Sequence, residues 1–145
     1  MKKTLLIILV VVVVIQFIRP KKNISNEVIN DITTVLTVPE DVQEIIKISC
    51  ADCHSNNTNY PWYSEIAPIS WYLASHVNDG KKHLNFSEWA TYNKHQKEHI
   101  IKDLKKELKS KKMPLNSYLW MHKDAVVSAD QYKILLDWVN TLKAE

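Results

Sequence analysis

Glycine is almost missing from this chain, with Gly80 the only one among 145 residues. Sandwiches and barrels built from many short strands use glycine at their tight turns, so the composition argues against a turn-rich β fold. Five prolines and several lysine-rich stretches with helical periodicity instead favour an all-α protein. With 46% hydrophobic residues, the chain is long enough for one ordinary domain with a real core and too short for two.

Cysteine is scarce as well, since the chain has only Cys50 and Cys53. A structural zinc site takes four ligands, usually in two Cys/His pairs, so zinc would have to recruit His76, His83 or His122. A thioredoxin-like dithiol lies between a strand and a helix in a βαβ pattern, and the sequence shows no such pattern. A zinc site, a redox dithiol and a plain disulfide therefore remain as alternatives to a more specific interpretation.

That interpretation comes from the spacing, because the cysteines form Cys50-Ala51-Asp52-Cys53-His54. The C-x-x-C-H pattern is the attachment signature of c-type haem. In it, each thiol adds to one haem vinyl group as a thioether, and the adjoining imidazole binds the iron as the proximal ligand. We therefore expect Cys50 and Cys53 to hold the porphyrin and His54 to bind the iron.

The N-terminus predicts export. Two lysines precede an apolar run from Thr4 to Ile18 that contains five consecutive valines. Fifteen residues is long for a signal peptide and short for a span, which needs about 17 to 25, but flanking lysines can snorkel. No small-residue cleavage site follows, so residues 1–22 are interpreted as an anchor, with a cleaved signal peptide and a periplasmic protein as the alternative. Covalent haem assembly requires the domain to lie outside the cytoplasm.

Residues 23–38 lack a strong period and are expected to be a linker, and residues 39–145 to form the domain. A helix is expected from Pro39 into the cysteine motif, with an apolar stripe of Val42, Ile45 and Ile46. Further helices are expected over Ile69 to about Asn78, with Gly80 as its C-terminal stop, and over Tyr92 to Lys109. Ser128 and Gln131 form a capping box for the last helix.

Charge is mildly positive overall, at +3, but it is concentrated between Lys94 and Lys112, where eight lysines stand against three acidic residues. Such a run is usually a solvated helix face with i,i+4 pairs. The functional alternative is a docking surface for an acidic redox partner or for anionic lipid headgroups. Nucleic acid is not expected as a partner of an exported domain.

The sixth position of a haem iron separates an electron carrier from a ligand-binding site. Met113 is the first choice for this position, because it follows His54 by 59 residues and precedes Pro114, in a turn that can present a thioether. His122, His76, Met121 and an open site are the alternatives, and Met113 could also simply fill a gap in the core. His83, His95 and His99 lie in polar stretches and are expected at the surface.

Aromatic residues are a further candidate group, because flat apolar rings suit a porphyrin but equally suit an ordinary core. The residues concerned are Tyr60, Trp62, Tyr63, Trp71, Tyr72, Trp89 and Trp120.

From Val38 to Val139 the chain resembles the bacterial haem-binding domain family, which comprises small, exported, cytochrome-c-like proteins with one haem. The matching stretches are Ser49 to Asn56, Tyr60-Pro61-Trp62-Tyr63, Ile66-Ala67-Pro68, His76-Val77, Leu84 to Trp89, Met113-Pro114-Leu115 and His122 to Ala125. The resemblance implies covalent haem at Cys50 and Cys53, His54 as axial ligand, and Met113 as the methionine of the family's Met-Pro turn. One departure is that Ser110-Lys111-Lys112 stands where a glycine is common.

Taken together, the sequence predicts a membrane-tethered, all-α, cytochrome-c-like domain with one covalent haem c. The expected function is electron transfer between redox proteins outside the cytoplasm, without catalysis by the protein itself. A haem-based sensor or small-ligand binder is the alternative from a different functional class, and a non-haem dithiol or zinc module is a third.

Overall fold

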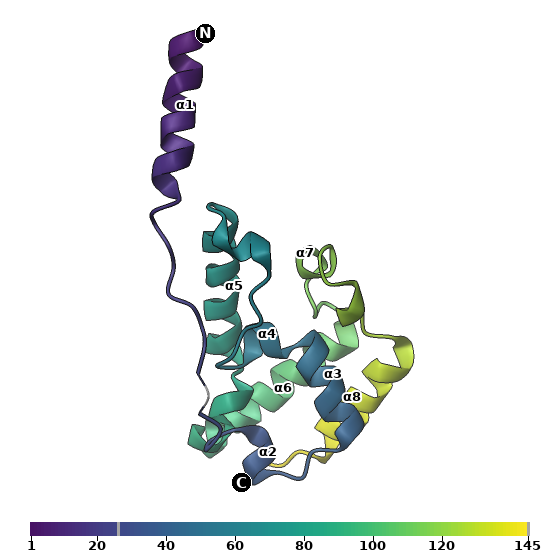
Figure 1. Cartoon of the computed structure of the whole chain (residues 1–145). Coiled ribbons are helices and arrows are strands. Elements are labelled where there is room, and N and C mark those ends of the chain that lie inside the picture. The colour runs from purple at the N-terminus through teal and green to yellow at the C-terminus, as the bar shows by residue number, and fades with distance from the viewer. Residues whose placement is uncertain (26, 145) are drawn as a thin grey trace.

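The computed structural model describes residues 1–25 and 27–144, and within these ranges every regular element is a helix and no strand is present (Figure 1). A single antiparallel bridge joins Ile24 to Asn57. The all-α prediction is confirmed. The elements in chain order are α1 (Lys2–Ile15), α2 (Ile32–Val35), α3 (Glu40–Ser49), α4 (Ala51–His54), η1 (Trp62–Glu65), α5 (Ile69–His83), η2 (Phe86–Thr91), α6 (Lys94–Ser110), α7 (Asn116–Leu119), η3 (Lys123–Ala125) and α8 (Ala129–Thr141).

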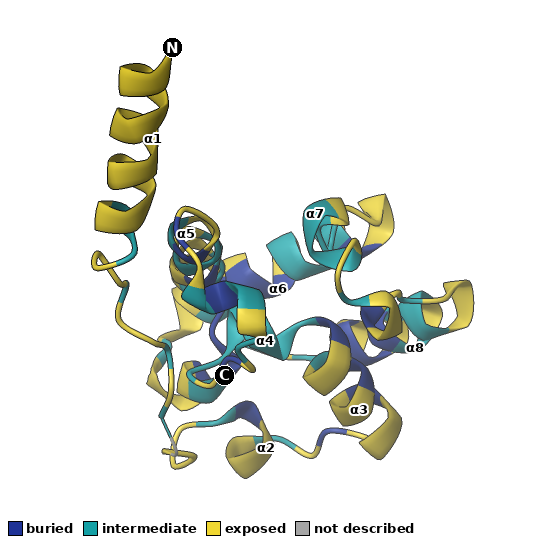
Figure 2. Ribbon diagram, turned by 45° about the horizontal axis from the view of Figure 1, so that its top comes forward, coloured by how far each residue is buried: buried dark blue, intermediate teal, exposed yellow. Residues whose placement is uncertain are grey.

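The hydrophobic core lies where α8 packs against α6 and α3 (Figure 2), and η2 adds Phe86 and Trp89 to it. Trp89 is the largest of its fully buried side chains, which also include Val139, so Trp89 belongs to the core and not to an open site. The other members are Ile32, Val38, Val42, Ile45, Leu84, Ile100, Ile101, Leu108, Leu135 and Trp138.

The helix boundaries follow local signals, several of which the sequence shows clearly. Pro39 directly precedes α3, whose first turn is acidic and complements the helix dipole. Ser128 and Gln131 exchange both hydrogen bonds of the predicted capping box at the start of α8. Asn93 caps α6 in the same way, so α6 begins two residues later than expected.

The second predicted helix is longer than its sequence suggests. Gly80 was expected to stop it, but α5 continues to His83, and Gly80 lies in the interior of the helix with an ordinary negative φ. Helical glycine costs about 1 kcal/mol relative to alanine, so a residue at this place requires another reason. That reason is the packing of α5 against α4, described below.

In the segment 23–38, expected to be a linker, the described residues lie along the domain. Asn23 accepts a backbone bond from Thr58 at 3.0 Å, and Asn30 accepts one from Ala90 at 3.0 Å. Ile32 and Val38 are buried in the core. The segment therefore adds apolar surface to the domain while it connects α1 to α3.

Helix α1 stands away from the rest of the molecule, and none of its residues is buried (Figures 1 and 2). It has 14 residues. Among the described residues, no helix combines the length and hydrophobicity needed to cross a membrane.

Candidate functional site

The cysteine motif lies at a break between two helices. α3 ends at Ser49, and Cys50 adopts φ −130° and ψ −37°, outside the helical region, before the single turn of α4. The Cys50 carbonyl accepts hydrogen bonds from the backbone N–H groups of Cys53 at 3.2 Å and His54 at 3.0 Å. The two thiols lie close enough for a charge on Cys53 to raise the pKa of Cys50, so this turn presents them together.

His54 is held in a defined orientation. Its Nδ1 lies 3.0 Å from the carbonyl oxygen of Leu84, which only a protonated nitrogen can contact as a hydrogen-bond donor. Burial lowers the pKa of His54, because the charged imidazolium loses solvation, while the bond to Leu84 opposes that shift. The result is a neutral ring with Nε2 left as the basic nitrogen, the form in which histidine binds a metal.

Gly80 allows α5 to approach this motif closely. A Cβ placed on Gly80 would lie 2.6 Å from the carbonyl oxygen of Cys53 and 3.1 Å from its Cβ. No other residue type fits such a contact without moving one helix. The only glycine of the chain is therefore explained by the contact between α4 and α5, which the sequence alone did not indicate.

The two thiols are partly buried and form no disulfide. Burial raises the pKa of Cys50 to about 12 and that of Cys53 to about 11, with the neighbouring Cys53 and Asp52 charges adding to the respective shifts. Zinc ligands and redox dithiols are used as thiolates, which proteins favour by lowering the cysteine pKa. In addition, the described residues hold no group of three or more His, Cys, Asp or Glu side chains placed to bind a metal.

Asp52, between the two cysteines, ties the motif to distant segments. Its Oδ1 accepts the backbone N–H of Asn59 at 2.9 Å, and its Oδ2 accepts the hydroxyl of Tyr118 in α7 at 2.8 Å. Its carbonyl accepts the Thr58 hydroxyl at 2.6 Å. No local signal in the sequence relates Asp52 to Tyr118, because the two residues lie 66 positions apart.

The network continues from Tyr118 to His122. The two rings stack at 4.0 Å with an interplanar angle of 11°, and His122 Nδ1 lies 3.0 Å from the Tyr118 carbonyl. Its Nε2 lies 3.3 Å from the hydroxyl of Tyr63. Both ring nitrogens of His122 thus have partners, which makes this histidine a weaker candidate for the sixth ligand than the sequence allowed.

Met113 lies just before α7, the helix that Tyr118 connects to the motif. It is partly buried, and its carbonyl accepts the hydroxyl of Tyr132 at 2.8 Å. Before the Met-Pro turn, where the family commonly has a glycine, this chain has Ser110-Lys111-Lys112. The backbone there still has a conformation that favours glycine, since Lys111 ends α6 in the left-handed region at φ 53°. The assignment of Met113 to the iron stays a prediction.

The other predicted histidines and Met121 lie at or near the surface. His83, His95 and His99 are exposed, as expected. His76 directs Nδ1 to the carbonyl of Tyr72, and Met121 is 60% exposed.

A surface groove on α6 is separate from the cysteine motif. It has a volume of about 840 Å³ and is lined by lysines of α6 together with Ile101, Leu142 and Ala144. The lysine-rich face expected from the sequence therefore exists as a surface of α6.

Comparison with protein families gives one match. A family described as a haem-binding domain matches residues 10–141, which is nearly the whole chain and includes the cysteine motif and Met113. Comparisons with curated proteins and with solved structures gave no match.

Proposed function

Because the chain belongs to the haem-binding domain family, we propose that it carries one c-type haem and transfers electrons outside the cytoplasm. Membership of this family supports haem as the cofactor. Covalent attachment, the identity of the iron ligands and electron transfer are the proposed parts. The observation that carries them is the geometry of His54: a neutral, oriented imidazole stands directly after two unpaired thiols on one helical turn.

The residues present fit this cofactor. The thiols of Cys50 and Cys53 would each add across a vinyl group, with sulfur bonding to one carbon and the proton passing to the other, so that no oxidant is needed. His54 would bind iron through Nε2, while the Leu84 carbonyl fixes the ring and increases its basicity. When bound, haem supplies an iron that alternates between the ferrous and ferric states.

The other residues hold the motif in place. Gly80 sets the distance between α4 and α5, and Asp52 fastens the motif to α7 and to the loop at Asn59. The segment that follows Met113 is thereby kept next to the motif. A Met113 thioether would close the sixth position and favour the ferrous state relative to a second histidine. With both His54 and Met113 bound, the iron would suit outer-sphere electron transfer, because its ligands would change little between the ferrous and ferric states.

Location and partners complete the proposal. Residues 1–22 would anchor the protein in the cell membrane with the domain on the outer side, and the alternative is a periplasmic protein released by signal cleavage. The lysines on α6 would attract an acidic redox protein. We propose a carrier and no catalytic activity.

The direct test is to express the full chain in a host with haem-attachment machinery. An alkaline pyridine haemochrome spectrum and a denaturing gel stained for haem should both show covalent c-type haem. The double variant Cys50→Ala, Cys53→Ala should lose the stain, whereas the control His83→Ala, an exposed histidine outside the motif, should retain it. A colourless wild-type protein with the mass of its amino acids alone would refute the proposal.

A haem-based sensor is the second candidate, and ligand binding separates it from a carrier. A six-coordinate, low-spin spectrum that carbon monoxide leaves unchanged supports the carrier. Ready binding of carbon monoxide by the wild-type protein would support the sensor.

A further inference from the structure

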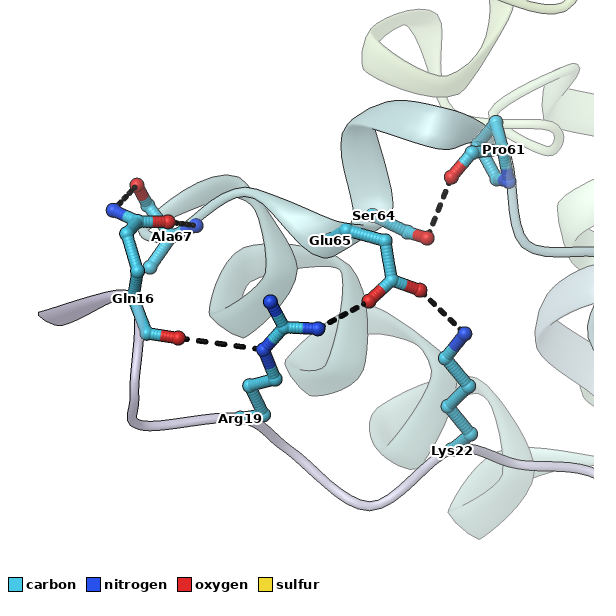
Figure 3. A network of polar contacts seen from close by, with 7 residues as sticks. All are labelled: Gln16, Arg19, Lys22, Pro61, Ser64, Glu65 and Ala67. Carbon is cyan, nitrogen blue, oxygen red and sulfur yellow. Dashed lines mark hydrogen bonds and ion pairs between the residues drawn. The ribbon is translucent and has the colours of Figure 1, made fainter.

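The chain that leaves α1 is fastened to the domain (Figure 3). The side-chain amide of Gln16 pairs with both backbone groups of Ala67, donating to its carbonyl at 3.2 Å and accepting from its N–H at 3.0 Å. Trp71 in α5 donates its indole N–H to the carbonyl of Ile18 at 2.7 Å. These hydrogen bonds of Gln16 and Trp71, which we call the latch, hold the end of α1 against the start of α5.

Two ion pairs lie beside the latch, made by residues that follow Gln16 in the chain. Glu65 pairs with Arg19 at 2.8 Å and also with Lys22 (Figure 3). The hydrogen bond and charge of Lys22 lower the pKa of Glu65, so the carboxylate stays ionised. Exposed pairs of this kind contribute little to stability, so we ascribe the fixed geometry to the Gln16 and Trp71 hydrogen bonds.

Four apolar side chains stand exposed around the latch. Phe17 and Ile18 come from the chain after α1 and are 82% and 59% exposed. Ile66 directly follows η1 and Ile69 begins α5, and they are 41% and 45% exposed. We call these four residues the collar. The hydrogen bonds between Gln16 and Ala67 bring these two exposed apolar segments together beside an apolar helix, and an exposed apolar patch of this kind marks an interaction surface.

Helix α1 indicates what covers the collar. Its residues Leu5 to Val14 are apolar on every side, and each is about half exposed. A partner protein helix would cover one face of α1, whereas a bilayer surrounds the whole helix. Basic residues follow directly at Arg19, Lys21 and Lys22, where anionic headgroups would attract them.

Helix α1 is shorter than the hydrocarbon core of a bilayer is thick. Its 14 residues extend about 21 Å, whereas the hydrocarbon core of a bilayer is about 30 Å thick. A short apolar segment is accommodated when its flanking residues are drawn toward the membrane. Since the latch joins α1 to the collar, drawing α1 inward brings the collar to the membrane surface.

Several backbone groups in the loop of the collar are already paired, which lowers the cost of bringing it into an apolar region. Gln16 satisfies both groups of Ala67, Pro68 has no N–H, and the N–H of Ile66 bonds to the Tyr63 carbonyl at 3.2 Å. Unpaired backbone groups are what normally exclude loops from an apolar phase.

We propose that Phe17, Ile18, Ile66 and Ile69 contact the lipid bilayer, and that Gln16 latches the domain to the membrane surface in one orientation. The inference rests on the proposed membrane anchor and does not depend on the haem. Its functional consequence is that α5, and through Gly80 the cysteine motif, is held at a fixed height above the membrane.

Photocrosslinking of the full-length holoprotein in vesicles of phosphatidylethanolamine and phosphatidylglycerol tests the proposal. With Ile69 replaced by benzoylphenylalanine, mass spectrometry should detect phospholipid adducts. The matched control carries the same group at Val126, an apolar residue 53% exposed between η3 and α8, and should give none. Adding Gln16→Ala should lower the Ile69 adduct yield several-fold, because two hydrogen bonds of the latch are lost.

Three results would overturn the proposal: no lipid adduct at Ile69, equal adducts at Ile69 and Val126, or crosslinks from Ile69 to a second protein chain. If Gln16→Ala left the yield of lipid adducts at Ile69 unchanged, the proposed role of Gln16 in orienting the domain would be refuted. Haem staining of the same sample reports separately on the proposed function. A haem-stained protein without lipid adducts would refute only the contact between the collar and the bilayer. A colourless protein with lipid adducts would refute only the haem attachment.

Discussion

Gly80→Ala tests whether the contact between α4 and α5 decides the identity of this residue. Helix propensity alone predicts that alanine in the interior of α5 stabilises the protein by about 1 kcal/mol. The structure predicts the opposite sign, because the new Cβ would lie 2.6 Å from the Cys53 carbonyl oxygen. That oxygen belongs to the backbone of the haem motif, so it cannot move aside as a flexible side chain would.

The magnitude follows from two opposing contributions. Overpacking of a tight contact costs about 1 to 3 kcal/mol, and the propensity gain offsets about 1 kcal/mol of it. A Cβ 2.6 Å from a backbone oxygen is closer than any ordinary contact, so we expect the overpacking cost in the upper part of this range, about 2 to 3 kcal/mol. The net destabilisation is then about 1 to 2 kcal/mol, which lowers the melting temperature by about 3 to 6 °C. Circular dichroism at increasing temperature measures the stability, and haem staining measures how much protein acquires the cofactor.

The control is Asn78→Ala, an exposed position on the same helix. It gains propensity without a contact to α4, so it should be neutral or slightly stabilising. Our reading of the contact would be refuted if Gly80→Ala stabilised the protein as much as this control and retained full haem content.

Three further predictions concern the end of α6 and the segment after it. Met113→Ala should leave haem attached but allow carbon monoxide to bind, as seen in the Soret spectrum; unchanged binding would move the assignment to His122 or Met121. Lys111→Gly should stabilise the protein by about 1 kcal/mol in thermal unfolding, because φ 53° strains a side chain; the same change at Lys112 should not. Burial and the Asp52 bond raise the pKa of Tyr118, so its contribution to stability is complete below about pH 10 and is lost as pH rises further. Tyr118→Phe should make this alkaline loss of stability shallower in denaturation at pH 10 to 11, and an unchanged slope would contradict the assignment.

The sequence by itself determined the features that depend on neighbouring residues. The helical class, the capping box at Ser128, the start of α3 after Pro39 and the C-x-x-C-H motif are all local patterns. They could be predicted because hydrogen bonds of a helix end and the spacing of two thiols involve residues a few positions apart.

Only the tertiary structure decided how the motif is supported. The carbonyl that orients His54 comes from Leu84, the partner of Asp52 comes from Tyr118, and Gly80 is required by Cys53. Each of these contacts joins residues separated by 27 to 66 positions, and helical periodicity does not specify which helices meet. Gly80 therefore looked like a helix stop in the sequence, whereas in the folded protein its missing side chain lets α5 pack against the cysteine motif.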